Sequence, residues 1–390
     1  MPLFFRFISD FFWNYKSISM VVNVYAIYYL VLSIAKQKSI TNSRMPKYIS
    51  IVIILFYIFL LNAYLIKTDE QSTKIFAKIS ISLLLFFIGV LNTSIIKDSQ
   101  KIAKLCSYFL VLELAFALTN NGFQFWGDVK TFSGYFFFKT DLALATVISL
   151  VYIIYFSQFK TYLLYFFISI SLFLIYIANS RIHLLTFFLI VAIYFSRKTL
   201  LNRLRFYLLF LFPLILILFY LFNLIISNFQ DSSHNNNYLT LNFSNFYSAE
   251  NLQGRDQIWN ILMEKFKIAD VKDKFLGLGL SADIKLNDRF SENTDSNNAH
   301  NNYLFLLISM GYLGSFFFYL FSIISLKKFF KNAQVYSDEK RRVLLLVFIS
   351  HIILFFTSSF SSSTLIFQQE TWFYMFFSGM LYNKCYFPKV

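Results

Sequence analysis

Long runs of apolar residues alternate with short polar connections along the chain, and this pattern predicts membrane-spanning helices. A bilayer core about 30 Å thick requires about 20 apolar residues, because a helix rises ~1.5 Å per residue. Runs of roughly this length cover residues 18–35, 48–66, 75–96, 102–118, 140–156, 161–178, 182–195, 206–226, 302–325, 343–360 and 364–382. The predicted fold is therefore an all-α integral membrane protein with about 11 (10–12) spans.

The composition agrees with a membrane protein and excludes a soluble domain. Hydrophobic residues make up 57% of the chain and charged residues 14%, and the mean hydropathy is +0.58. A water-soluble fold has no means of burying this much apolar surface. The net charge of +15 does not indicate nucleic acid, because the lysines and arginines mostly lie in connections between apolar runs, as topology signals do.

The distribution of these basic residues predicts the orientation of the chain. One set of alternate connections, including 36–47 and 326–342, carries 20 lysines and arginines, whereas the other set carries 8. The richer set is expected in the cytoplasm. The long segment 227–301 then lies outside, between an N-terminal bundle of about eight spans (1–226) and about three C-terminal spans with a short cytoplasmic tail (302–390).

The long outer segment differs in composition from the rest of the chain. It contains ten of the twenty acidic residues, and it includes the Asn-rich run Asp231–Asn237. Between Arg255 and Ile268, apolar residues recur at helical spacing, which predicts an amphipathic helix on the membrane surface or over the bundle. Farther along, Gly277 and Gly279 predict a turn where the backbone approaches a neighbour closely.

His300 is the titratable group of this segment best suited to proton exchange near neutral pH. It precedes Asn301 at the start of the ninth predicted span, where unpaired N–H groups and the helix dipole favour an anion. The alternative is that His300 and Asn301 only cap this helix.

Two arginines are expected near the level of the lipid headgroups on the outer side. Arg255 begins the amphipathic helix, with Trp259 one turn later, and Arg181 separates two apolar runs. A guanidinium binds phosphate oxygens in a bidentate manner. Membrane anchoring for Arg255 and Trp259, and snorkelling for Arg181, are the alternatives.

Three further ionisable residues lie in or at the ends of spans: Glu113, His351 and Asp141. Such groups are functional candidates by default, but polar pairs that tie helices together are sufficient to explain them.

Several of these residues occur within an ordered series of short motifs. The motifs are Phe132-Ser133-Gly134 followed by Asp141-Leu142-Ala143, then Asn179-Ser180-Arg181, Gly254-Arg255 with Trp259, Gly277-Leu278-Gly279, and Ala299-His300-Asn301 with Tyr303, Gly311 and Gly314. In this order the chain resembles the O-antigen ligase and polymerase superfamily, particularly its Wzy-type polymerases of O-antigen, capsular or other surface polysaccharides.

The resemblance implies a metal-independent glycosyltransferase with a GT-C-like fold and no cofactor. It would act at the outer face of a bacterial inner membrane, with its active-site loop in the periplasm, on sugars carried by polyprenyl diphosphate. By motif position, Arg181 and Arg255 would bind the diphosphate, and His300 with Arg255 would be catalytic. Asn301 and Trp259 would support them.

The function predicted from the resemblance is polymerisation of lipid-linked oligosaccharide repeat units into O-antigen, capsule or exopolysaccharide. A ligase that moves the finished glycan to lipid A core is the alternative within the same chemistry. A flippase or transporter would instead place its polar groups near the membrane midplane. Expected partners are the lipid-linked repeat units, membrane lipids, a chain-length regulator and a flippase. Asp141, where the family often has Asn, is a further supporting residue.

A lipid diphosphate is already an activated leaving group, so the reaction mainly needs positive charge and a base. Loop carboxylates are alternatives to His300 as that base: Asp256, Asp283 and Asp288.

Overall fold

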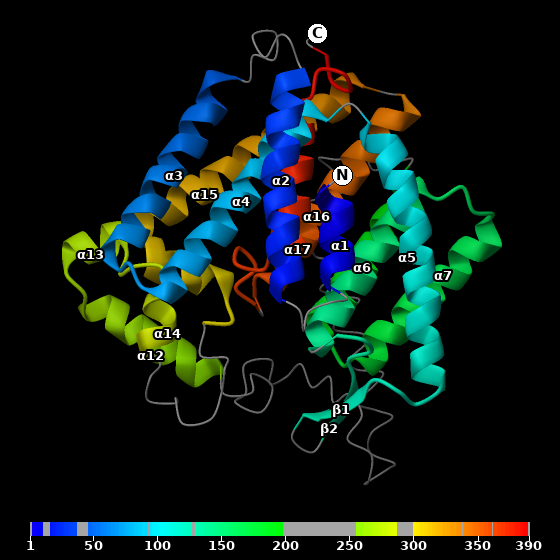
Figure 1. Ribbon diagram of the computed structural model, residues 1–390, viewed down its shortest axis with the longest axis horizontal. Helices are drawn as coiled ribbons and strands as arrows, with labels where there is room; N and C mark the ends of the chain where they lie inside the picture. The colour runs from blue at the N-terminus through cyan, green and yellow to red at the C-terminus, as the bar shows by residue number, and fades with distance from the viewer. Residues whose placement is uncertain are drawn as a thin grey trace.

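The protein is a bundle of helices with smaller elements gathered toward one end (Figure 1). The computed structural model describes residues 2–10, 16–36, 46–92, 94–126, 129–136, 138–197, 255–286, 299–336, 338–360 and 362–388. Within these ranges, six helices are long and apolar enough to cross a membrane. The chain is therefore an all-α integral membrane protein, as its hydropathy predicts.

Ten of the eleven predicted spans fall on helices, although the predicted span 75–96 runs past the end of its helix at Leu91. The described residues form fourteen helices. They are α1 (Pro2–Asp10), α2 (Lys16–Lys36), α3 (Lys47–Ile66), α4 (Glu70–Leu91), α5 (Ile95–Leu118), α6 (Lys139–Phe156), α7 (Thr161–Ile177), α8 (Arg181–Phe195), α12 (Arg255–Ile268), α13 (Val271–Leu276), α14 (Ala282–Leu286), α15 (Asn302–Val335), α16 (Glu339–Ser358) and α17 (Gln368–Met380). The predicted span 206–226 and the Asn-rich run lie outside the described residues. The short predicted span 182–195 corresponds to α8, which has 15 residues.

A small β-hairpin lies between α5 and α6 in the described part of the chain, and the apolar pattern did not predict it. Strands β1 (Phe123–Trp126) and β2 (Val129–Phe132) pair antiparallel, with Phe123 opposite Phe132. The two rings lie 5.0 Å apart, and the ammonium of Lys130 lies 4.8 Å from the centroid of the Phe123 ring. Strands of four residues are too short to establish a period of two, which explains why the sequence pattern missed them.

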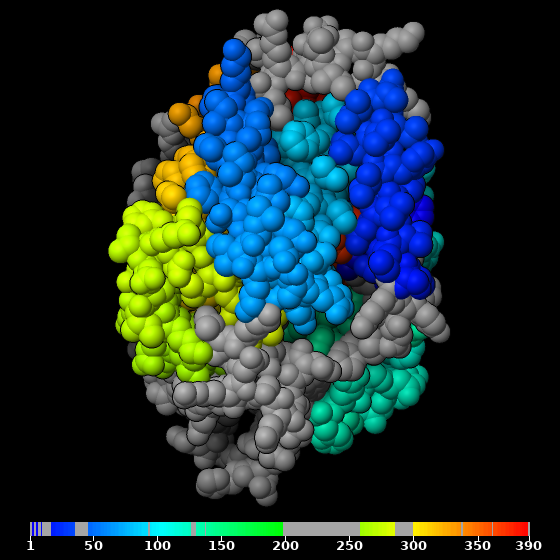
Figure 2. Space-filling view, turned by 60° about the vertical axis from the view of Figure 1, so that its left-hand side comes forward, coloured from blue at the N-terminus to red at the C-terminus, as the bar shows by residue number. Residues whose placement is uncertain are grey.

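The amphipathic helix predicted at 255–268 is α12, and it packs over the bundle. Leu262 and Phe266 are buried, and the Phe266 ring packs edge-to-face against Tyr312 of α15 at 5.5 Å between centroids. The segment from α12 to α14 lies beside α3 and α4 in the space-filling view (Figure 2). In the ribbon view α12 and α14 lie with the hairpin toward the end away from the C-terminus (Figure 1).

Glycines allow the outer segment to contact α15 backbone to backbone. The N–H of Leu278 donates to the Ile308 carbonyl at 2.8 Å. Gly277 has φ 89° and ψ 170°, and Gly311, at a kink in α15, has φ 66° and ψ −169°. These are conformations that essentially only glycine adopts. A Cβ on Gly277 would lie 2.3 Å from the Ser309 carbonyl oxygen, so the predicted close approach is confirmed.

Gly277→Ala should therefore markedly lower the thermal denaturation temperature of the purified protein in detergent. The substitution adds backbone strain of about 1–3 kcal/mol and a clash with the backbone oxygen of Ser309. Gly279→Ala is the comparison, because its Cβ would meet its nearest atom, Cβ of Lys67, at 3.3 Å, so that strain applies with only slight crowding. Equal, small losses in both variants would show that the contact with α15 is not tightly packed.

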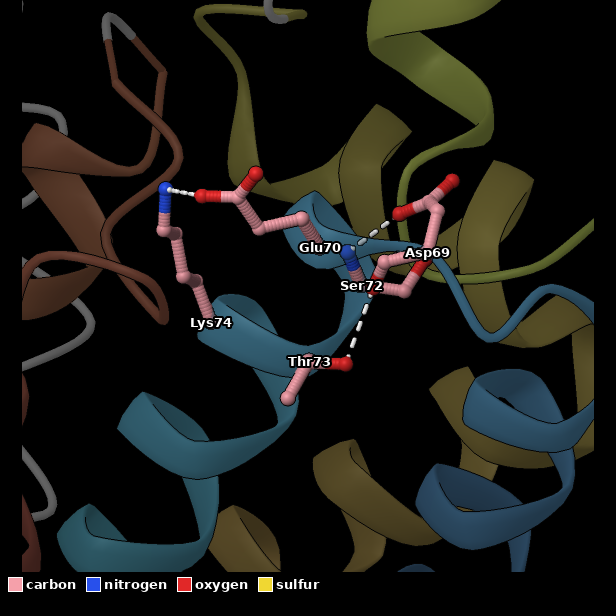
Figure 3. A network of polar contacts seen from close by, with 5 residues as sticks. All are labelled: Asp69, Glu70, Ser72, Thr73 and Lys74. Atoms are coloured by element: carbon pink, nitrogen blue, oxygen red, sulfur yellow. Dashed lines mark hydrogen bonds and ion pairs between the residues drawn. The ribbon is translucent and has the colours of Figure 1, made fainter.

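Asp69 joins the same outer segment to the turn between α3 and α4. As the N-cap of α4, it accepts the N–H of Ser72 through Oδ1 at 2.7 Å, and its main-chain oxygen accepts the Thr73 hydroxyl (Figure 3). Its other carboxylate oxygen accepts the hydroxyl of Ser281 at 2.8 Å. The N–H of Leu280 also donates to a carbonyl near the end of α3. The segment is thus fixed on two sides, to α15 and to α3–α4.

Candidate functional site

The last turn of α16 lies between the start of α8 and the start of α15. On the α8 side, the hydroxyls of Thr186 and Thr357 are hydrogen-bonded at 2.6 Å. Thr186 lies in the second turn of α8, five positions after Arg181. This contact therefore fixes the Arg181 end of α8 against the end of α16. Arg181 itself is half-buried.

On the α15 side, two hydrogen bonds join the first turn of the helix to the same part of α16. The N–H of Asn302 donates to the Ser359 carbonyl at 2.9 Å, and the hydroxyl of Tyr303 donates to the Phe356 carbonyl at 3.0 Å. His300 immediately precedes this turn. The fold thus brings the Arg181 and His300 regions, far apart in the sequence, to the same end of the bundle.

His300 occupies a backbone conformation that is unusual for a residue with a side chain. Its φ is 45°, and its side chain is half-buried. A positive φ in a non-glycine residue costs free energy and persists only when the surrounding structure imposes it. Asn179, two residues before Arg181, also has a positive φ, of 52°. Such positions cluster at functional sites, which makes both turns candidates.

The first N–H groups of α15 are not free to bind an anion, which corrects the expectation drawn from the sequence. The Asn301 side chain caps the helix, with Oδ1 accepting from Tyr303 at 2.9 Å and from Leu304 at 3.2 Å. The N–H of Asn302 is used by α16. Asn301 therefore has the capping role, whereas His300 lies one residue before the cap. Positive charge for a diphosphate must then come from side chains.

Trp259 connects α12 to the residue before His300. Its Nε1–H donates to the carbonyl of Ala299 at 2.8 Å, so it is more than a membrane anchor. Arg255 is the first residue of α12; the described part of the structure includes its backbone and not its side chain.

Asp283, one of the carboxylates considered as a base, is fully buried in α14 and accepts the N–H of Ala299 through Oδ2 at 3.0 Å. Burial raises its pKa to about 6, and the backbone N–H of Ala299 limits the rise. Because the folded pKa exceeds the ordinary value of 3.8, protonated Asp283 stabilises the fold fully below about pH 3.8, and this contribution is lost as the pH rises through 6. A buried, hydrogen-bonded carboxyl is poorly placed to accept a substrate proton. Asp288 lies outside the described residues, as does the side chain of Asp256.

Glu113 and Asp141 lie beside the hairpin. The buried Glu113 carboxylate accepts the N–H of Tyr135 at 3.3 Å, and a Cβ on Gly134 would lie 1.9 Å from its Oε2. Glu113 therefore anchors the turn that follows β2. Asp141 lies half-buried in the first turn of α6.

His351 packs as an aromatic residue in the bundle. Its ring is stacked against Phe373 and Phe377, with centroids 5.2 and 5.0 Å away. These contacts favour the helix-packing interpretation over a catalytic one. A pair that sequence reasoning missed is Ser180 and His183, whose Oγ and Nδ1 lie 2.7 Å apart at the buried start of α8. The spacing of three residues at a helix start was the available signal.

Comparison with known proteins gives one family match. A family model described as O-antigen ligase matches residues 165–319, from α7 into α15. This range contains Arg181, Arg255, Asp283 and His300. This match supports the resemblance to the O-antigen ligase and polymerase superfamily, whose members transfer glycans. No curated protein matches the chain.

Proposed function

We propose that this protein polymerises oligosaccharide repeat units linked to polyprenyl diphosphate into a surface polysaccharide. The observation that carries the proposal is the meeting of the α8 and α15 starts at the end of α16. Arg181 is thereby at the same end of the bundle as His300, and Trp259 ties α12 to that end. A cation and a proton acceptor are the two groups that transfer from a lipid diphosphate needs.

In the proposed reaction, an acceptor hydroxyl attacks the anomeric carbon of the donor glycan, and the bond to the diphosphate oxygen breaks. His300 takes the hydroxyl proton, and Arg181 with Arg255 stabilises the charge that develops on the departing polyprenyl diphosphate. An imidazole has an unperturbed pKa near ~6.5 and exchanges protons at neutral pH. The arginines act in place of a metal, so elongation is expected to continue in the presence of a chelator.

The site is proposed to face the periplasm or cell exterior from the bacterial inner membrane. Support comes from the connections rich in lysine and arginine, 20 residues against 8, which predict that segment 227–301 lies outside. A diphosphate headgroup lies at the membrane surface, where arginines at helix starts are able to reach it.

A ligase would use the same donor and the same groups, so the products of the reaction must separate the two functions. Deletion of the gene should abolish the ladder of lipid-linked glycans of increasing length and leave single repeat units. Accumulation of long polymer on the polyprenyl carrier would instead identify a ligase. If the deletion instead left the repeat units on the cytoplasmic side of the membrane, the protein would be a flippase.

A further inference from the structure

The peptide groups of Ala299 are held by two side chains from the outer segment. Asp283 Oδ2 accepts its N–H at 3.0 Å, and Trp259 Nε1 donates to its carbonyl at 2.8 Å. Ala299 and Asp283 are fully buried. The two side chains come from different helices, α14 and α12, and lie 16 and 40 positions before Ala299 in the sequence. We call Asp283 and Trp259 the Ala299 clamp.

The clamp acts on the residue next to His300. On its other side, His300 is followed by Asn301, which caps α15, and by Asn302, whose N–H is bonded to α16. The backbone of His300 is therefore fixed both before and after it. This accounts for its positive φ of 45°, because a costly conformation persists only where the surroundings determine it.

We propose that Asp283 and Trp259 are positioning residues that set the place of the His300 imidazole by holding Ala299. The inference rests on the proposed function, in which His300 accepts the proton of the acceptor hydroxyl. Neither residue of the clamp needs to contact the substrate. Gly277 contacts α15, and Ser281 donates to Asp69, so the outer segment is held in place. These contacts keep α14 and the Asp283 carboxyl next to Ala299.

Conservative variants separate the effect of losing a hydrogen bond from the effect of disturbed packing. Trp259→Phe keeps an aromatic ring and removes the Nε1–H donor, and Asp283→Leu keeps the branched shape and the number of heavy atoms and removes the acceptor. Each should lower kcat for elongation about 10- to 100-fold with little change in KM, because small misplacements of a catalytic group have effects of this size. Asp283→Asn retains an acceptor oxygen and should keep activity within about threefold of wild type. Asp270→Asn, at an exposed position of the same segment, is the matched control.

A double-mutant cycle with His300→Asn distinguishes positioning from a general structural role. If the clamp acts through His300, Trp259→Phe should have almost no further effect once His300 is replaced. Losses that multiply in the double variant would overturn the inference, as would wild-type kcat in both Trp259→Phe and Asp283→Leu. If His300→Asn is inactive while both clamp variants are fully active, the inference fails and the proposed role of His300 stands. A fully active His300→Asn would overturn the proposed role of His300 and the inference with it.

Discussion

His300→Ala should reduce chain elongation by about 100- to 10,000-fold, the usual contribution of a general base, while the protein still inserts at its normal level. The imidazole is the group proposed to take the proton of the acceptor hydroxyl. It lies half-buried directly before the capped start of α15, on a turn held by contacts from α12, α14 and α16.

A second substitution, His300→Asn, distinguishes the effect of losing the base from the effect of a disturbed backbone. Asparagine tolerates a positive φ better than alanine does, so His300→Asn preserves the turn and should be equally inactive. His234→Ala, in the Asn-rich run, is the control and should leave elongation unchanged. A full ladder of products from His300→Asn at normal expression would mean that another group is the base.

Arg181→Lys should lose about 90–99% of elongation activity, although it preserves the charge. A lysine ammonium lacks the planar fork that binds two diphosphate oxygens together, and hydrogen bonds to charged groups contribute about 1.5–3 kcal/mol each. Arg255→Lys is expected to behave in the same way. Elongation is measured with the purified variants at saturating lipid-linked donor.

The matched control for Arg181 lies just beyond the other end of the same helix. Arg197 donates to the Tyr194 carbonyl at 3.1 Å, and its guanidinium lies 4.0 Å from the centroid of that tyrosine ring. Arg197→Lys should therefore retain elongation activity. Full activity in both Arg181→Lys and Arg255→Lys would reduce these arginines to membrane anchors.

The sequence predicted the elements of this fold better than the contacts between them. The apolar spans and the amphipathic helix at 255–268 were predictable because hydrophobic periodicity is a local property. Gly277 and Gly279 predicted a close approach, but only the structure shows that Gly277 meets α15 and that Gly279 meets the end of α3. The two residues of the Ala299 clamp lie 16 and 40 positions before Ala299 in the sequence. Nothing in a local pattern specifies such contacts.

In the candidate site, too, the sequence predicted the residues better than the contacts between them. Motif order pointed to Arg181, Arg255 and His300, whereas the sequence did not reveal that the end of α16 lies between the α8 and α15 starts. The free N–H groups expected at the start of α15 are used by the Asn301 side chain and by α16. Asp283, considered as a spare base, is buried against Ala299. Both differences arise from tertiary contacts.

Elongation by the purified protein alone is the most direct test of the proposed polymerase. The protein in detergent or vesicles is incubated with a polyprenyl-diphosphate-linked repeat unit, and the products are separated by length. We predict a ladder of lipid-linked oligomers with release of polyprenyl diphosphate, formed equally with and without a chelator and lost in His300→Asn. Unchanged single repeat units, under conditions in which the protein is folded and a known acceptor such as lipid A core is glycosylated, would contradict the account.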